Sequence, residues 1–202
     1  MAETETRTLA VATGNAHKRS ELEAMLAPLG VTVVLARDHG LGEVVEDGDT
    51  FAANALKKAR EGYEVTGFPC LADDSGLEVD ALGGAPGVRT ARYAGEGCSY
   101  ADNRAKMLAE LAGVEDRGAA FRTVALIVWP DGEELAVEGV CRGTIAIEER
   151  GELGFGYDPI FIPDGQDAGS ERTVAEFTAA EKQSQSHRAR AFGALIPLLA
   201  GL

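Results

Sequence analysis

Apolar residues recur along this 202-residue chain with two spacings, one typical of strands and the other of helices. Short apolar runs predict buried strands at residues 8–13, 31–35 and 119–129. Apolar positions three and four apart predict a helix that ends before Gly30, and further helices at about 50–65 and 99–111. Because strands and helices follow one another, the pattern predicts an α/β fold that opens with a βαβ unit.

The second half of the chain predicts a hairpin, and therefore a mixed sheet. Residues 130–133, Pro-Asp-Gly-Glu, follow the long apolar run and are typical of a turn, so residues 135–142 are expected to return antiparallel. Residues 155–163 predict a loop that enters a strand. Thr178 and Glu181 have capping-box spacing at the start of a helical C-terminal region. The length suits a single domain over residues 1–202, and we find no internal repeat.

Composition narrows the function classes. A net charge of -14 argues against nonspecific binding to nucleic acid or anionic membranes, because such binding needs clustered Lys and Arg. A small phosphorylated ligand is compatible with it, since a few of the five lysines can hold one locally. No apolar run approaches the ~20 residues that span a bilayer. The polar, acidic N-terminus is unlike a secretory signal, so a cytoplasmic location is expected. Three widely spaced cysteines predict reduced, structural thiols.

The densest chemistry lies in residues 73–80, Asp-Asp-Ser-Gly-Leu-Glu-Val-Asp. The apolar residues 70–72 before it are typical of a buried strand end. Asp73 and Asp74 are therefore expected at the C-terminal edge of that strand, where open α/β sheets bind ligands. Four acids within eight residues can bind a hard divalent cation through oxygen. An Asp-Ser-Gly turn between two strands explains the same residues. Partners elsewhere in the chain must decide between the two.

Two further segments are suited to phosphate and metal. Residues 13–18, Thr-Gly-Asn-Ala-His-Lys, join the first strand to the first helix, where backbone N–H groups and Lys18 suit a phosphate. Their spacing is not that of a Walker A loop, and an ordinary βα loop is the alternative. Glu46 lies in an acidic loop before a helix that places Asn54 and Lys58 on one face. The acids of this loop, Glu46, Asp47 and Asp49, can share a metal with Asp74, or they form a solvated loop.

A third group is suited to a purine base. Residues 155–158, Phe-Gly-Tyr-Asp, supply an aromatic ring and a carboxylate on glycine-loosened backbone, which suits stacking on a base and hydrogen bonding to it. Lys182, His187 and Arg188 lie near the C-terminus, and His187 with Arg188 can donate to a carbonyl oxygen. The alternatives are a β-turn with core aromatics and a His-Arg pair on a helix surface.

Together and in this order, the motifs resemble the inosine triphosphate pyrophosphatase family over nearly the whole chain. The resemblance implies hydrolysis of deaminated purine nucleoside triphosphates (ITP, dITP and XTP) to the monophosphate and pyrophosphate with Mg²⁺, which removes them from the nucleotide pool. It also implies a long central mixed sheet flanked by helices, two lobes with the active-site cleft between them, and a homodimer. The matching residues are Thr13 to Asn15 with Lys18, Glu46, Asn54-Ala55, Lys58-Ala59, residues 72–76 through 91–95, residues 154–161, Glu181-Lys182 and residues 186–188.

The resemblance also implies individual roles. Asp74 is expected to accept a proton and, with Glu46, to bind the metal, while Asp73 is a supporting acid and Lys58 assists catalysis at the phosphates. The expected substrate-binding residues are Thr13, Gly14, Asn15, Ala16, His17 and Lys18 at the triphosphate, then Ser75, then Phe155, Gly156, Tyr157, Asp158, Lys182, His187 and Arg188 at the nucleoside. Two positions depart from the family: His17, where a small residue is common, and Gln183, where asparagine is common.

Base selection and competing functions follow from the same residues. Donors from His187 and Arg188 favour a 6-keto oxygen over the amino group of adenine, which would leave those donors unpaired. Guanine also has a 6-keto group, so rejection of GTP needs another feature. A Maf-like pyrophosphatase acting on pyrimidine or modified nucleotides is an alternative enzyme. A noncatalytic nucleotide-binding module is a further alternative, but a pure binder has no need of a poised carboxylate base such as Asp74. If Asp74→Asn leaves ITP turnover near wild type, the catalytic assignment of Asp74 is wrong.

Overall fold

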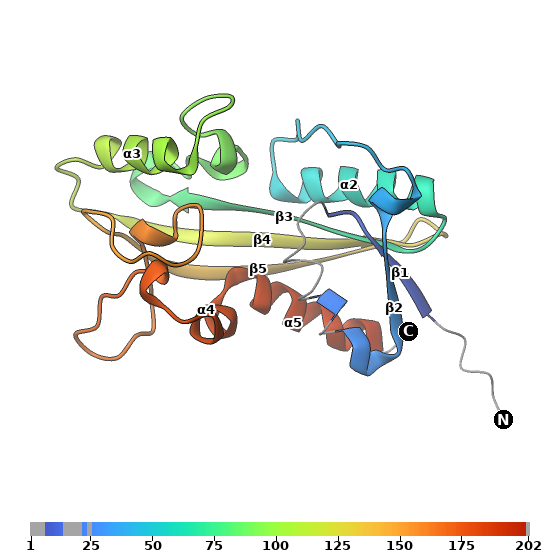
Figure 1. Cartoon of the computed structure of the whole chain (residues 1–202). Coiled ribbons are helices and arrows are strands. Elements are labelled where there is room, and N and C mark those ends of the chain that lie inside the picture. The colour runs from blue at the N-terminus through green and yellow to red at the C-terminus, as the bar shows by residue number, and fades with distance from the viewer. Residues whose placement is uncertain (1–6, 14–21, 24–25, 201–202) are drawn as a thin grey trace. The chain divides into compact units, whose positions relative to one another are not determined.

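The computed structural model describes residues 7–13, 22–23 and 26–200 (Figure 1). These residues form one six-stranded sheet in the order β2-β1-β3-β4-β5-β6. Its strands are β1 (Arg7–Val11), β2 (Val31–Leu35), β3 (Cys70–Val79), β4 (Gly118–Val128), β5 (Glu134–Ile145) and β6 (Phe161–Pro163). The α-helices are α2 (Phe51–Thr66), α3 (Tyr100–Glu110), α4 (Ala179–Gln185) and α5 (His187–Ala200). Short 3-10 turns are η1 (Ala27–Leu29), η2 (Ala36–His39), η3 (Asp80–Leu82), η4 (Gly87–Arg92), η5 (Asp158–Ile160) and η6 (Val174–Glu176).

The sheet is mixed, as the sequence predicts. β1 pairs in parallel with β2 and with β3, and β5 pairs antiparallel with β6. β4 and β5 are neighbours joined by a tight turn, in which the Trp129 N–H donates to the Glu133 carbonyl at 2.9 Å. A connection this short makes the two strands antiparallel. The predicted hairpin is therefore confirmed, with a β5 that is longer than expected.

The chain divides into two compact units. Unit 1 comprises Met1–Asp74, Thr123–Glu138 and Ala191–Leu202, and unit 2 comprises Ser75–Arg122 and Gly139–Arg190. β3, β4 and β5 each contribute residues to both units. The single domain over residues 1–202 stays a prediction.

In unit 1, side chains alternate between the two faces of β1, and a different helix packs on each face. Leu9 and Val11 pack with Phe192 and Leu195 of α5 in one hydrophobic cluster. Residues of the opposite parity point the other way, and that face is covered by α2. Figure 1 shows α2 and α5 on opposite sides of the strands of this unit. Both faces of β1 are thus covered by helices, and its last three residues are buried, as its apolar sequence predicts.

Unit 2 has a hydrophobic core of its own. Met107 of α3 and Leu111, the residue after this helix, pack with Leu77 and Val79 of β3 and with other buried residues of the unit. Helix α3 begins with the capping box that the Ser99 hydroxyl forms with Asp102. The cap satisfies N–H groups that a first helical turn leaves without partners.

The structure corrects the expected position of Asp73 and Asp74. They lie inside β3 rather than at its C-terminal edge, and the alternative of a turn at this point is also wrong. The physical reason is that Leu77 and Val79, both fully buried, resume the strand after the acids and Gly76. The two acids nevertheless lie beyond the carboxyl end of the neighbouring parallel strand, since β1 ends where Val11 pairs with Leu71.

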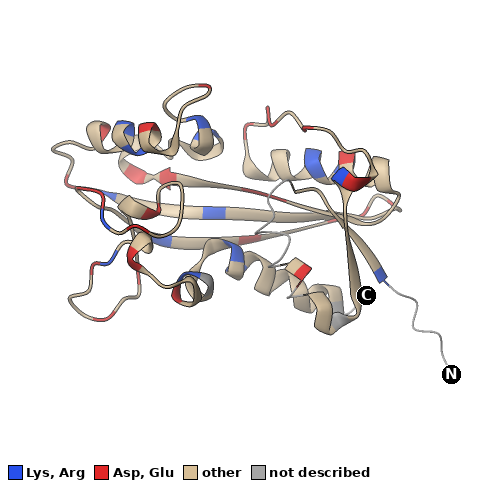
Figure 2. Cartoon of the chain, in the orientation of Figure 1, with Lys and Arg blue, Asp and Glu red and all other residues tan. Residues whose placement is uncertain are grey.

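Charged residues are dispersed over both units. Figure 2 shows Lys and Arg scattered among Asp and Glu rather than gathered into one stripe. The remaining acids of the segment are ion-paired, Glu78 with Arg122 at 3.0 Å and Asp80 with Arg142 at 2.8 Å. Among the helices that the structure describes, none is long and apolar enough to cross a membrane.

Candidate functional site

Helix α2 supplies one functional face in unit 1. Its N-terminus is fixed by Thr50, whose side chain accepts a hydrogen bond from the Ala53 N–H at 3.1 Å. Asn54 and Lys58 follow one turn apart, so their side chains point the same way. Asn54 is only 1% exposed, and the Lys58 side chain is 13% exposed. A polar amide and an ammonium group are therefore held against the sheet.

The alternation of β3 brings Asp74 to that face. Cys70, Ala72 and Asp74 share one side of the strand, and Asp73 points to the other. Asn54 Nδ2 donates to Asp74 Oδ2 at 3.0 Å, which confirms that Asp74 faces α2. Asp73 and Asp74 are both buried, at 5% and 9% exposed. Two adjacent acids thus have different surroundings because a strand turns neighbouring side chains apart.

Lys58 links two acids that are distant in the sequence. Its Nζ lies 2.6 Å from Glu46 Oε1 and 3.5 Å from Asp74 Oδ1. Burial acts to lower the pKa of Lys58, but the charge of Asp74 and the hydrogen bond and charge of Glu46 outweigh it, so the pKa is raised. A raised pKa means that this pairing is lost only as pH rises above the usual lysine range. Lys58 is a cation at neutral pH.

The same oxygens suit a hard divalent cation. Within the described residues, no group of three or more His, Cys, Asp and Glu side chains is placed to hold a metal ion. Mg²⁺ needs fewer protein ligands than that, because it keeps waters and binds through one or two carboxylates plus substrate phosphates. Glu46 and Asp74 already converge on one cation, the Lys58 ammonium. A donor set of two carboxylates facing a common point fits such an ion.

The remaining phosphate-side residues are described only in part. Gly14, Asn15, Ala16, His17 and Lys18 lie outside the described residues. Thr13, just after β1, is half-buried, as is Ser75, which follows Asp74 in β3 and belongs to unit 2.

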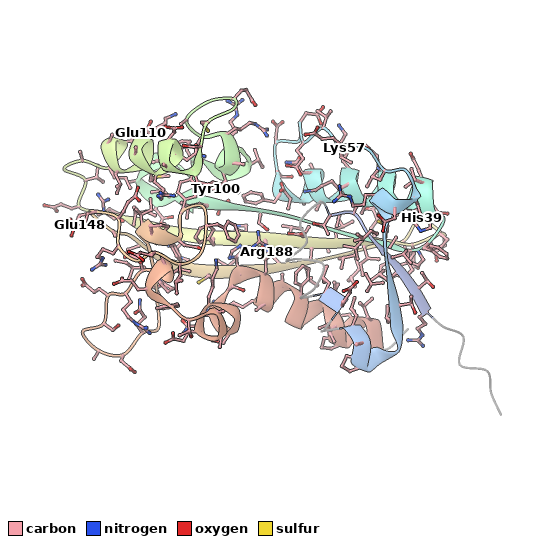
Figure 3. All side chains as sticks on the ribbon, in the orientation of Figure 1. His39, Lys57, Tyr100, Glu110, Glu148 and Arg188 are labelled. Carbon is pink, nitrogen blue, oxygen red and sulfur yellow. The ribbon has the colours of Figure 1, made fainter. Side chains whose placement is uncertain are left out.

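In unit 2, the Phe155 ring is the centre of the second group. The ring is 46% exposed, and two cations lie over it: Lys182 Nζ at 4.4 Å from the ring centroid and Arg188 Cζ at 6.0 Å. Tyr100 lies beside it with ring centroids 6.3 Å apart. Figure 3 labels Tyr100 and Arg188 at the starts of α3 and α5. An exposed ring with cations around it is a platform suited to a flat base with keto oxygens.

Asp158 holds this group together. It is 6% exposed, accepts the Phe155 N–H at 2.8 Å and pairs with Lys182. Gly154 has a positive φ of 80°, and an added Cβ would lie 2.1 Å from Asp158 Oδ2. Only glycine therefore permits the carboxylate to sit so close to the loop.

Tyr157 and Arg104 fix the loop from within the unit. Tyr157 is 2% exposed and its hydroxyl donates to the Thr90 carbonyl at 2.9 Å. Arg104 of α3 donates to the Gly156 carbonyl at 2.9 Å and pairs with Glu149 at 3.0 Å. Of the two rings in the loop, Phe155 faces outward and Tyr157 packs in the core.

His187 lies beside a small cavity. Its ring stacks on Phe121, with centroids 5.0 Å apart. The cavity next to it holds about 30 Å³, room for about two waters and less than a purine needs. Its polar lining comes from Asp158, Lys182, Gln185, Ser186 and His187. His187 is thus oriented by an aromatic neighbour that the sequence did not associate with it.

The sequence alone gives no role to four residues of these groups. It places Asn54 on the face of Lys58, and it offers no sign of the contacts that Tyr100, Arg104 and Phe121 make. The signal for Asn54 was present, because a polar residue four positions before Lys58 shares its buried face. Arg104 and Phe121 are distant in sequence from the residues they contact, and no local pattern marks them.

Comparison with known proteins gives a consistent result. A family model described as Ham1 family matches residues 9–198. A protein of Corynebacterium efficiens named dITP/XTP pyrophosphatase is 48% identical over 202 residues, which is 96% of this chain and 98% of the relative. A relative of the same name from Mycobacteroides abscessus is 48% identical over 95% of this chain and 94% of its own length.

Solved structures agree with the sequence relatives. The structure of a HAM1 protein from Coxiella burnetii has a TM-score of 0.90 and 36% identity, and covers 97% of this chain and 100% of that chain. A nucleoside-triphosphatase, dITP/XTP pyrophosphatase, from Mycobacterium abscessus has a TM-score of 0.80 and 47% identity, and covers 95% of this chain and 99% of that chain. Nearly the whole length of the chain therefore takes part in the similarity.

Proposed function

This chain belongs to the Ham1 family, and on that premise we propose that it is a dITP/XTP pyrophosphatase. It hydrolyses dITP, XTP and ITP to the nucleoside monophosphate and pyrophosphate, and so removes deaminated purines from the nucleotide pool. The observation that carries the proposal is the position of Lys58 between Glu46 and Asp74. A buried cation and two carboxylates at the carboxyl end of a parallel strand suit phosphoryl chemistry.

Asp74 acts as the proton acceptor. Its carboxylate is fixed by Asn54 on one oxygen and faces Lys58 with the other, so it presents a defined direction to an attacking water. General-base catalysis by a positioned side chain contributes ~10²–10⁴-fold. The Lys58 ammonium stays charged and offsets negative charge on the phosphates. Asp73 supports the site as a neighbouring acid, and residues 13–18 are proposed to bind the triphosphate.

Glu46 and Asp74 would hold the divalent cation, for which we propose Mg²⁺. When bound, such an ion neutralises charge that develops on the phosphate oxygens in the transition state. The protein's own contribution is to bring two carboxylates to one place from a loop and a strand.

The purine is proposed to bind through the Phe155 group. The exposed ring stacks on the base, while Lys182, His187 and Arg188 donate hydrogen bonds to it. Donors at the purine 6-position favour the keto oxygen of hypoxanthine or xanthine, because the amino group of adenine would leave them unpaired. Asp158 supports this selection by holding Lys182 in place.

A nucleotide panel tests the function. The purified protein is incubated with dITP, XTP, ITP, ATP, GTP, UTP and TTP, with Mg²⁺ or with excess EDTA, and both pyrophosphate and orthophosphate are measured. We expect pyrophosphate from dITP, XTP and ITP, and none with EDTA. Orthophosphate release without pyrophosphate would contradict the proposed reaction. A preference for UTP or TTP would identify a Maf-like specificity instead.

A further inference from the structure

The Asn54 carboxamide joins the two segments that carry the carboxylates. Its Oδ1 accepts the Gly48 N–H at 2.8 Å, and its Nδ2 donates to Asp74 Oδ2 at 3.0 Å. The orientation of the amide follows from its neighbours, because a backbone N–H can only donate and a carboxylate accepts. Asn54 is 1% exposed, so water does not replace either bond.

The contact with Gly48 is as close as the backbone permits. A Cβ at Gly48 would lie 2.7 Å from Asn54 Oδ1 and 2.9 Å from the Ala53 Cβ. The acidic loop is therefore seated directly on the first turn of α2, and Glu46 lies two residues before this contact. Asn54 thus affects the position of both acids. It contacts Asp74 directly, and it holds Glu46 in place through the loop.

Helix α3 contains a matching asparagine with a different partner. Residues 50–54, Thr-Phe-Ala-Ala-Asn, and residues 99–103, Ser-Tyr-Ala-Asp-Asn, both run from the N-cap to the fourth helical residue. Asn103 is also 1% exposed, and its Oδ1 accepts a loop N–H, that of Ala94, at 2.7 Å. Its Nδ2 donates to the Ala91 carbonyl at 3.0 Å. The two asparagines share the role of tethering a loop, and only Asn54 donates to a carboxylate.

We propose that Asn54 is a positioning residue for the reaction: its amide orients Asp74 and seats the loop that carries Glu46. The inference rests on the proposed function, because the direction of the Asp74 carboxylate matters only if Asp74 accepts a proton in that reaction. Asn54 itself does not touch the substrate.

The variant Asn54→Asp separates the two bonds. Its side chain has the same shape and still accepts the Gly48 N–H, so the loop tether is kept. The Nδ2 donor is replaced by an oxygen that faces Asp74 Oδ2, and two oxygens at hydrogen-bond distance with no donor between them repel. Asp74 is then expected to turn away from its native direction. The matched control is Asn103→Asp, which makes the same exchange at the same helical position of α3.

The test measures kinetics and metal binding in both variants. We expect Asn54→Asp to lower kcat for dITP at least about tenfold, with KM within about threefold of wild type, since partners of metal ligands typically contribute ~10–100-fold. Mn²⁺ serves as the probe for the metal-free protein, and its dissociation constant, followed by electron paramagnetic resonance, is expected to rise by about the same factor. Asn103→Asp is expected to change neither quantity by more than about twofold, although its melting temperature falls.

A double variant guards against loss of folding. Asn54→Asp combined with Asp74→Asn exchanges the amide and the carboxylate, so the hydrogen bond between the two positions is restored. We expect the melting temperature to recover toward wild type while turnover stays lost, because the carboxylate is now in the wrong place. Recovery of both would overturn the proposal.

Two other results would overturn it as well. One is an Asn54→Asp protein that keeps kcat and Mn²⁺ affinity within about twofold of wild type. The other is an equal loss in Asn103→Asp, which would show a general effect of buried charge. If wild-type protein releases no pyrophosphate from dITP, the proposed function fails instead, and the comparison of Mn²⁺ affinities still reports on the Asn54 contact.

Discussion

Asp74 and Asp73 show how one backbone step changes what a residue can do. The two acids are adjacent, but the alternation of β3 turns Asp74 toward Asn54 and Lys58, whereas Asp73 acts on Lys58 through its charge. Both are buried, so each depends on specific neighbours rather than on water. Predictions at the residue scale therefore concern single side chains and the partners that orient them.

The Asp74→Asn variant tests the proton acceptor. The amide oxygen still accepts from Asn54, so this contact is kept, but an amide is not a base. We expect kcat for dITP to fall by at least about 100-fold with little change in KM. Asp80→Asn is the control, since Asp80 is an exposed ion-pair partner of Arg142. Turnover of Asp74→Asn close to wild type would show that another group accepts the proton.

The Phe155→Ala variant tests the base platform. Stacking of a base on an aromatic ring contributes ~1–3 kcal/mol, so KM for dITP is expected to rise at least about fivefold while kcat changes less. Phe155→Tyr keeps the ring and is expected to keep KM. Equal KM values for Phe155→Ala and wild type would place the base elsewhere.

At the scale of elements, α2 is placed by close contact with the sheet. Gly62 allows this, because an added Cβ would lie 2.4 Å from Cys70 Sγ and 3.2 Å from the Ala12 Cβ. Burial raises the pKa of the Cys70 thiol to about 12, so the sulfur is a neutral packing atom. The position of Asn54 and Lys58 over β3 depends on this packing.

Gly62→Ala tests that contact. Alanine ordinarily stabilises a helix interior by up to ~1 kcal/mol relative to glycine, but here we expect the free energy of unfolding to fall by about 1–3 kcal/mol. Gly193 of α5 has nothing within 4 Å of an added Cβ, so Gly193→Ala is the control and should be neutral or stabilising. Urea unfolding measures both variants. Equal stability of the two would contradict the close approach of α2.

The start of α4 carries a pH-dependent cap. Hydrogen bonds from Arg172 and from the backbone and hydroxyl of Thr178 lower the pKa of Glu181 from 4.5 to about 2. A lowered carboxyl pKa means that the stabilisation is present above about pH 4.5 and is lost as pH falls toward 2.

Glu181→Gln removes this pH dependence. Glutamine can still form a capping box but carries no charge to pair with Arg172. We expect its melting temperature to be lower than that of wild type at pH 7, and the difference to shrink as pH falls below about 4.5. Melting curves over this range give the result. A difference that stays constant with pH would show that the Glu181 charge does not contribute.

At the scale of the whole molecule, net charge affects the association of two copies of the chain. Each chain carries a net charge of -14, and the family resemblance predicts a homodimer. Two such chains repel over a range that falls from about 30 Å at 0.01 M salt to about 10 Å at 0.1 M. A cytoplasmic location likewise stays a prediction.

Light scattering with size exclusion tests the dimer. We expect a mass of twice 21.2 kDa, with less monomer at the higher salt concentration because repulsion between like charges is screened. A mass of one chain at all salt and protein concentrations would contradict the dimer.

The sequence by itself determined the local structure of this protein and its family. Strand and helix positions follow from side-chain alternation and helical spacing, and Thr50, Ser99 and Thr178 cap helices because each cap involves residues only three apart. Motifs of this kind can be recognised in the sequence alone, since local backbone geometry depends on near neighbours.

Only the tertiary structure decided how the acids and rings are arranged. It placed Asp74 within β3 and brought it to Asn54 and Lys58 across 20 and 16 residues of sequence. It also put Lys182 and Arg188 over the Phe155 ring. Such contacts depend on which face of a strand meets which helix, and that choice is made by packing of the whole core rather than by any short segment.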